Sequence, residues 1–156
     1  MTDARFEDGG EAPLRLKALD AEDLTVVSAL VQDSVFPTTE MAWDRARRRF
    51  ALLVNRFRWE EGARIGDHPP ERVQSMLVID DVMAVASQGI DRGDRDTVLS
   101  LLALDWQPGE DGTGRLVLVL AGDGAIAVDV ECIDVTLRDV TRPYLAPSRK
   151  VPDHPE

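Results

Sequence analysis

The sequence predicts an α+β fold, in which a single, mostly antiparallel β barrel or sandwich is covered by one N-terminal helix. Three observations predict this fold. A helical repeat of apolar residues follows one short strand near the N-terminus, strand-like runs separated by turn residues fill the second half, and the length of 156 residues suits one domain. With 44% hydrophobic and 30% charged residues, the chain has the composition of a globular protein.

Folded structure is expected to begin near Leu14. Residues 1–13 are polar and acidic and predict a disordered leader before a domain at residues 14–142. LRLKAL, at residues 14–19, alternates as a half-buried strand does. Asp20 then precedes a helix expected over residues 21–32, which carries acidic residues in its first turn and an apolar repeat at Leu24, Val27, Leu30 and Val31.

The stretch WDRARRRFALLVNRFRWEE, at residues 43–61, fits two structures. As a helix it aligns Trp43, Ala46, Phe50, Leu53 and Phe57 in one stripe. As strands it forms a hairpin around DRARR, with Phe50, Leu52 and Val54 on one face and a break near Asn55. Its aromatic content and the strand-like segments after it favour the hairpin, but periodicity alone does not decide.

The second half of the chain predicts antiparallel strands throughout. RVQSMLVI and VMAVASQGI lie on either side of a turn at Asp80-Asp81, and GRLVLVL pairs with AIAVDVE across AGDG, the strongest hairpin signal present. The apolar positions change phase near Cys132, which predicts a bulge, a bend or a short helix. Cys132 itself lies among apolar residues and is expected to be a small buried core residue. The four prolines of residues 143–156 predict an extended tail.

Charge and cysteine content bear on location and partners. A formal net charge of −11 disfavours generic binding to nucleic acids or to anionic membranes. The single cysteine fits a reducing compartment, the first residues lack a secretory signal, and no apolar run approaches the roughly 20 residues that span a bilayer. A cytoplasmic protein is therefore expected.

Residues that carry chemistry are scarce. His68 and His154 have no cysteine or second histidine at ligand spacing, and the acids of the loop DRGDRD have the wrong spacing for a calcium site, so no metal is expected. The glycines form no phosphate-binding loop, and no serine sits in a nucleophile motif. We therefore expect no cofactor and no catalytic residue, and favour a protein that is not an enzyme.

The arginine-rich segment is the distinctive feature of the sequence. Between Arg45 and Arg64 the local charge is +5, so the remainder of the chain carries −16. These arginines can grip an anion together with neighbouring aromatic rings, or they can be the outward residues of strands paired with acids on neighbouring strands. The candidate binding residues are Arg47, Arg49, Arg56, Arg58 and Trp59.

The chain also resembles a family of uncharacterised alphaproteobacterial proteins, a domain of unknown function. The resemblance is carried by DLTVVSALVQDSV, RRRFALLVNRFRWE, VASQGID, LLALDW, GDGAIAVDVECIDVTLRDV and PDHP, and it covers residues 14–155. It implies a free-standing cytosolic protein and no assigned activity. The order of turns and strands is also similar to pleckstrin-homology-like barrels, which are binding modules, although fold alone does not fix function.

These observations predict a non-catalytic cytosolic binding module that uses residues 45–59 to contact a protein or a small anion. A second copy of the chain is a further candidate partner. One alternative is a small enzyme in which carboxylates and Arg56 or Arg58 act on an anionic substrate. Another is a weak binder of single-stranded nucleic acid through the same segment, which the net charge disfavours.

Overall fold

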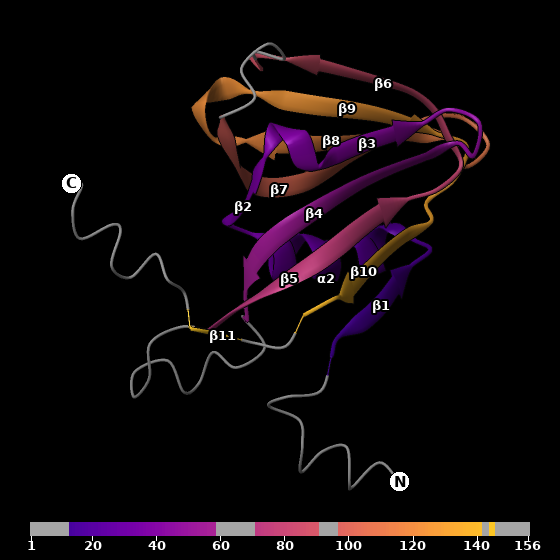
Figure 1. The fold of residues 1–156 in the computed structure, drawn as a ribbon. Coiled ribbons are helices and arrows are strands. Elements are labelled where there is room, and N and C mark those ends of the chain that lie inside the picture. The colour runs from indigo at the N-terminus through magenta and orange to yellow at the C-terminus, as the bar shows by residue number, and fades with distance from the viewer. Residues whose placement is uncertain (1–12, 59–70, 91–96, 142–143, 146–156) are drawn as a thin grey trace, which may run out of the picture.

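In the computed structural model, which describes residues 13–58, 71–90, 97–141 and 144–145, the strands form one antiparallel sheet wrapped around a core (Figure 1). The predicted α+β fold is confirmed. The elements are β1 (Arg15–Ala18), α2 (Ala21–Val31), β2 (Ser34–Pro37), η1 (Thr38–Glu40), β3 (Met41–Asp44), β4 (Arg49–Phe57), β5 (Glu71–Ile79), β6 (Val82–Gln88), β7 (Val98–Pro108), β8 (Gly114–Leu120), η3 (Ala121–Asp123), β9 (Ala125–Val130), β10 (Val135–Asp139) and β11 (Tyr144–Leu145).

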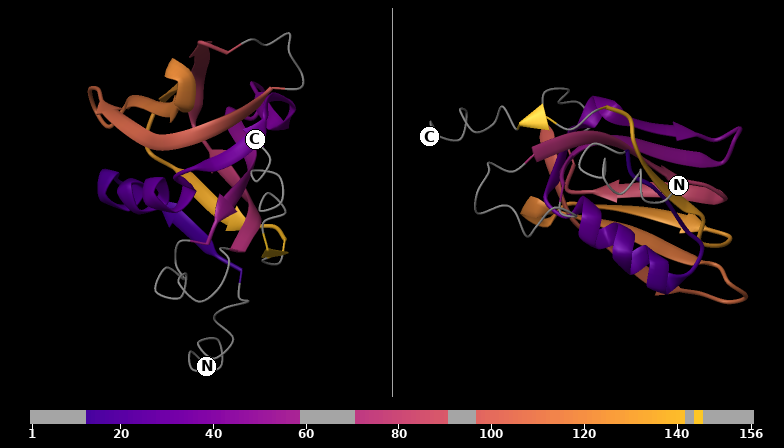
Figure 2. Two further views of the ribbon diagram at one scale, coloured as in Figure 1. Left: turned by 90° about the vertical axis from the view of Figure 1, so that its left-hand side faces the viewer. Right: turned by 90° about the horizontal axis from the view of Figure 1, so that it is seen from below.

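The sheet has two halves that face each other across the core (Figure 2). One half has the order β1-β10-β5-β4, and the other has the order β2-β7-β8-β9-β6. The halves meet where β2 pairs with β4, at Val35 and Asn55. Two short strands lie off this path, because β3 pairs with β4 and β11 pairs with β5. The fold is therefore an open, curled sheet rather than a closed barrel.

Helix α2 begins and packs as its sequence predicts. The Asp20 side chain accepts a hydrogen bond from the backbone N–H of Asp23 at 2.8 Å, which caps the helix. Leu24, Val27 and Val31 are buried, and the helix contacts β1, β4 and β7. Helix α2 therefore covers the core on the side where β1 ends the first half of the sheet.

The hairpin interpretation of residues 43–59 is confirmed for its described part, because Trp43 pairs with Phe50 and Asp44 with Arg49. The predicted break near Asn55 is wrong. Even-numbered residues point inward along the whole of β4, so Arg56 follows Phe50, Leu52 and Val54 into the interior. The alternation of inward and outward side chains continues through Arg56 because Asp139 and Ser75 bind its guanidinium in the interior.

The turns of the second half agree with the sequence prediction in two of three places. Asp80-Asp81 is not a hairpin turn, because β5 pairs with β4 and β10 whereas β6 pairs with β9 in the other half of the sheet. The phase change near Cys132 is a bend that carries the chain from β9 to β10. The β8–β9 hairpin is confirmed, with Leu118 opposite Ile126.

Candidate functional site

The turn between β3 and β4 places three arginines at one end of the sheet. Asp44 Oδ1 accepts a hydrogen bond from the backbone N–H of Arg47 at 3.2 Å, and the backbone N–H of Arg48 donates to the carbonyl of Arg45 at 3.2 Å. Arg48 has a φ of 57°, a left-handed conformation that glycine or asparagine adopts more cheaply. The contacts of the Arg48 side chain with Val82 and Glu131 offset the cost of this backbone conformation.

Arg48 fastens the hairpin to β6. Its carbonyl accepts a hydrogen bond from the backbone N–H of Val82 at 2.9 Å, and its Nε donates to the carbonyl of Val82 at 3.4 Å. Its guanidinium also forms an ion pair with Glu131 at 2.9 Å. Arg48 thus joins the two halves of the sheet at one point, next to the beginning of β6.

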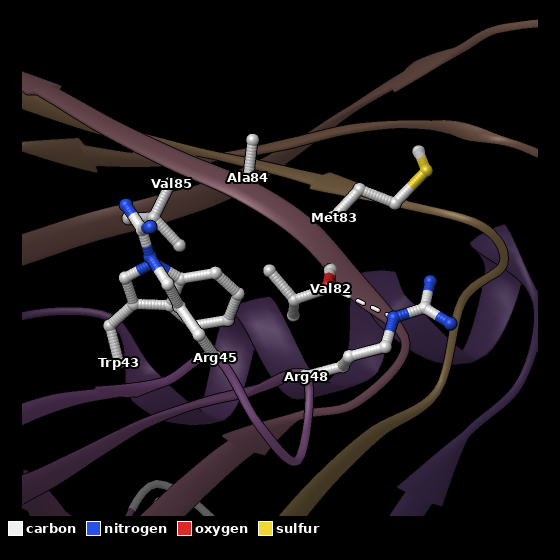
Figure 3. Close-up of a pocket in the computed structure, with 7 residues that line it drawn as sticks. All are labelled: Trp43, Arg45, Arg48, Val82, Met83, Ala84 and Val85. Atoms are coloured by element: carbon white, nitrogen blue, oxygen red, sulfur yellow. Dashed lines mark hydrogen bonds between the residues drawn. The ribbon is translucent and has the colours of Figure 1, made fainter.

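Beyond that junction a groove separates the hairpin from β6 (Figure 3). We name it the β3–β6 groove, and its volume of about 520 Å³ falls within the usual range for binding sites. Val82 is buried, and Trp43 and Val85 pack against the core, so the floor is partly apolar. The lining residues are Trp43, Arg45, Arg48, Val82, Met83, Ala84 and Val85.

Arg45 is the arginine of the turn that is available to a ligand. Its side chain is exposed and lines the β3–β6 groove. Within the described residues it makes no ion pair or side-chain hydrogen bond, whereas Arg47, Arg48 and Arg49 all have carboxylate partners. In Figure 3, Val82 lies between the guanidinium groups of Arg45 and Arg48. An anion in the groove would therefore meet Arg45 first.

Two of the predicted binding residues, Arg47 and Arg49, lie on the surface. Arg47 pairs with Asp44 of its own turn at 3.8 Å, and Arg49 Nε donates to Asp80 Oδ1 at 2.8 Å. The hydrogen bond from Arg49 to Asp80 is the main reason that the pKa of Arg49 is raised above its ordinary value. Both arginines are exposed and paired with acids, but Arg47 lies in the turn and pairs within its own hairpin, so it is not the outward strand residue that one of the two interpretations expected.

Arg56 and Arg58 point inward, so the expectation that they are outward residues of strands is wrong. Arg56 has no exposed surface and forms an ion pair with Asp139, whose Oδ1 lies 2.9 Å from Nη2. Its Nε donates to Ser75 Oγ at 2.9 Å, and Ser75 in turn donates to Asp139 at 2.7 Å. Asp139 also accepts a hydrogen bond from the backbone N–H of Leu14 at 2.8 Å. This network connects β4, β5, β10 and the residue before β1.

Arg58 continues the same inward row at the end of β4. Its Nη1 donates to Glu71 Oε1 at 2.7 Å, and its side chain is only 3% exposed. On the opposite face, the guanidinium of Arg72 lies 4.1 Å from the ring centre of Phe57, a cation–π contact. Trp59, the remaining predicted binding residue, lies outside the described residues. The binding role predicted for Arg56 and Arg58 stays a prediction, and both already hold carboxylates.

The groove contains residues that the sequence did not single out. Arg45 lies in the predicted contact segment 45–59 but was not one of the five named binding residues, Trp43 lies just before that segment, and β6 was predicted only as a strand. One signal was present: VMAVASQ, the sequence of β6, has no charge and no proline, which is unusual for an edge strand. The placement of β3 and β6 on the two sides of the groove has no local signature.

A family model described as protein of unknown function (DUF2948) matches residues 14–154. The chain belongs to this family. The match confirms the predicted resemblance to an uncharacterised family, and the family description itself assigns no activity. Comparison with curated proteins and with solved structures gives no match. The likeness to pleckstrin-homology-like barrels therefore stays a prediction.

Among the residues that the structure describes, no three His, Cys, Asp or Glu side chains gather in a group that could hold a metal ion. The two histidines and the acids of residues 91–96 lie outside the described part. No helix in the described part of this DUF2948 chain is long and apolar enough to cross a membrane.

Cys132 is exposed, so its predicted burial in the core is wrong. The alternation of β9 ends at Val130, and Cys132 occupies the bend that follows, outside any strand. Its Sγ donates a hydrogen bond to Asp81 Oδ2 at 3.3 Å. This hydrogen bond, followed by partial burial, raises the pKa of the Cys132 thiol. The thiol is therefore protonated at neutral pH and is a weak nucleophile.

The buried network gives a first prediction. Arg56→Met leaves Asp139 buried without its cation, which should lower the free energy of unfolding by about 3–5 kcal/mol. Urea unfolding at neutral pH measures this loss. The matched control is Arg49→Met, which removes an exposed arginine of the same strand and should leave the urea midpoint nearly unchanged.

A double variant separates charge from packing. Arg56→Met combined with Asp139→Leu removes both charges and should recover much of the stability that the single variant loses. If Arg56→Met unfolds at the same urea concentration as Arg49→Met, the Arg56–Asp139 pair does not hold the sheet as described.

Cys132 gives a second prediction. Asp81 has a φ of 59°, which asparagine tolerates, so Asp81→Asn removes the charge with little strain. The pKa of the Cys132 thiol should then fall, and its alkylation by iodoacetamide at mildly alkaline pH should become several-fold faster. Asp44→Asn, which changes net charge equally, is the control.

The hydrogen bond between Cys132 and Asp81 also makes the stability of the fold depend on pH in a definite direction. The pKa of the Cys132 thiol is higher in the folded protein than in the unfolded chain. The hydrogen bond to Asp81 therefore stabilises the fold fully below the ordinary thiol pKa, and this stabilisation is lost as pH rises through the folded pKa. An alkylation rate in Asp81→Asn equal to that of the unmodified chain would show that Asp81 does not control the thiol.

Proposed function

We propose that this chain is a non-catalytic interaction module of the alphaproteobacterial cytoplasm that binds a carboxylate-bearing segment of a partner protein in the β3–β6 groove. The observation that carries the proposal is Arg45, an exposed cation without an ion-pair partner among the described residues, at the side of a partly apolar groove. Within the contact surface predicted at residues 45–59, the proposal uses only the turn at residues 45–48.

The charge of the groove favours an anion. Its lining has two arginines and no carboxylate, although the chain carries a formal net charge of −11. Arg48 is already paired with Glu131, so Arg45 supplies most of the free positive charge. A guanidinium binds carboxylates with two parallel hydrogen bonds, which suits it to this role.

The apolar part of the floor favours a protein segment over a small free anion. Trp43 and Val85 offer apolar surface that a small, fully charged anion would not use. Aromatic residues and arginine are the residues most enriched where proteins bind one another. A partner that combines an acid with apolar side chains would use both parts of the groove.

Binding is favoured over catalysis by the bonds of the inner arginines. The enzyme alternative requires Arg56 or Arg58 to hold a substrate beside a carboxylate. Both arginines instead hold Asp139 and Glu71 inside the protein. These bonds account for the carboxylate–arginine pairs as structural elements, so the groove is the better candidate for function.

The proposal predicts an acidic ligand that depends on Arg45. Random short peptides displayed on phage and selected on the full chain should enrich Asp and Glu together with apolar residues. Arg45→Gln should weaken the enriched peptides about three- to tenfold, as expected for a partly exposed charged hydrogen bond. Fluorescence anisotropy with labelled peptides measures the dissociation constants.

Two controls make this experiment decisive. Arg15→Gln removes an exposed arginine of β1, at the opposite end of the sheet, and should not change the affinity. Oligodeoxythymidine tests the nucleic-acid alternative, and should bind more weakly than the peptides at physiological salt. No enrichment, an equal effect of both substitutions, or tighter binding of oligodeoxythymidine would each overturn the proposed function.

A further inference from the structure

Strand β6 ends the sheet with an edge that carries neither charge nor proline. It pairs with β9 on one side, and no other described strand pairs with it. Natural sheets protect such edges with charges, prolines, short strands or bulges. The strand β6 is 7 residues long and has neither charge nor proline.

The opposite end of the sheet shows the contrast. There β1 is only 4 residues long, carries Arg15 and Lys17 on its exposed face, and contacts helix α2. One edge is therefore protected by length, charge and cover. Strand β6 has a bulge near its beginning, but it has neither the short length nor the charges of β1, so its regular part from Ala84 to Gln88 offers an edge for pairing among the described residues.

The position of the groove agrees with this use of β6. A register shift between Val82 and Ala84 bulges the strand beside the junction with Arg48, and regular pairing with β9 continues from Ala84 to Gln88. The groove is lined from β6 by the residues around this bulge, up to Val85. A chain that lies in the groove thus runs along the first regular residues of the unpaired edge.

We infer that the partner segment binds as an added β-strand along the free edge of β6, which makes the DUF2948 domain a receptor for an extended acidic peptide. This inference rests on the proposed function. Backbone hydrogen bonds to the outer edge of β6 would supply affinity, as in other cases of strand addition. Alternate side chains of the guest would face Trp43 and Val85, and an acid near one end would meet Arg45.

A second copy of this chain is a poorer guest. Its own β6 would bring no carboxylate to Arg45, because that strand is uncharged. Each copy also carries a net charge of −11, which opposes association. A different protein with an acidic segment that readily forms a strand can both hydrogen-bond to the edge of β6 and pair with Arg45.

The test uses the peptide with the highest affinity from the selection on phage. A strand added to one edge turns every second N–H toward its neighbour, so N-methylation should fall into two alternating classes. Methylation at one set of alternate positions should weaken binding at least tenfold, and methylation at the other set should have little effect. Backbone amide NMR signals of Ala84, Val85 and Ala86 should shift with peptide added.

The outcomes separate this inference from the proposed function. If a peptide binds in an Arg45-dependent way, but N-methylation shows no alternation or the β6 signals do not move, strand addition is wrong and the anion-binding module stands. If no peptide binds, both fail. If sedimentation shows that the chain itself forms dimers as its concentration rises, the occupant of the β6 edge is a second copy of the chain, and the inferred peptide is wrong.

Discussion

The ion pair between Arg56 and Asp139 is the interaction on which the first half of the sheet depends. It brings β4, β5 and β10 together in the interior, and through the backbone N–H of Leu14 it also fixes the entry into β1. Breaking a buried pair is costly because the remaining charge has no solvent to stabilise it. The network therefore allows a charged strand end to face inward and keeps the phase of β4 unbroken.

The buried pairs of the inner arginines leave the turn between β3 and β4, at the other end of β4, as the place where an arginine is available to a ligand. Because the inner arginines are occupied, the cation available to a ligand is Arg45 in the turn, beside the β3–β6 groove. Arg48 joins the hairpin to β6 at one point, and beyond it the two strands separate. The sheet thus closes around its core but leaves one strand edge next to a positive, partly apolar groove.

Local patterns in the sequence were sufficient for the helix and for the β8–β9 hairpin, because capping, periodicity and turn residues are properties of neighbouring positions. They failed where a partner lies far along the chain. The inward direction of Arg56 depends on Asp139, 83 residues later, so alternation seemed to break near Asn55. Cys132 looked buried among apolar neighbours although a bend exposes it. The groove is built from β3 and β6, which share no local motif, and only the charge-free sequence of β6 could have pointed to it.

The central claim is that the edge of β6 is open in the unbound protein, and native-state amide hydrogen exchange measures this directly. The outward-facing amides among Ala84, Val85 and Ala86 should exchange fast, because no described strand pairs with them, whereas amides of the central strand β8 and the amide of Val82, bonded to Arg48, should be strongly protected. If every amide of β6 is protected to the same degree as those of β8, the edge is already paired. The groove would then not be a site for a partner strand.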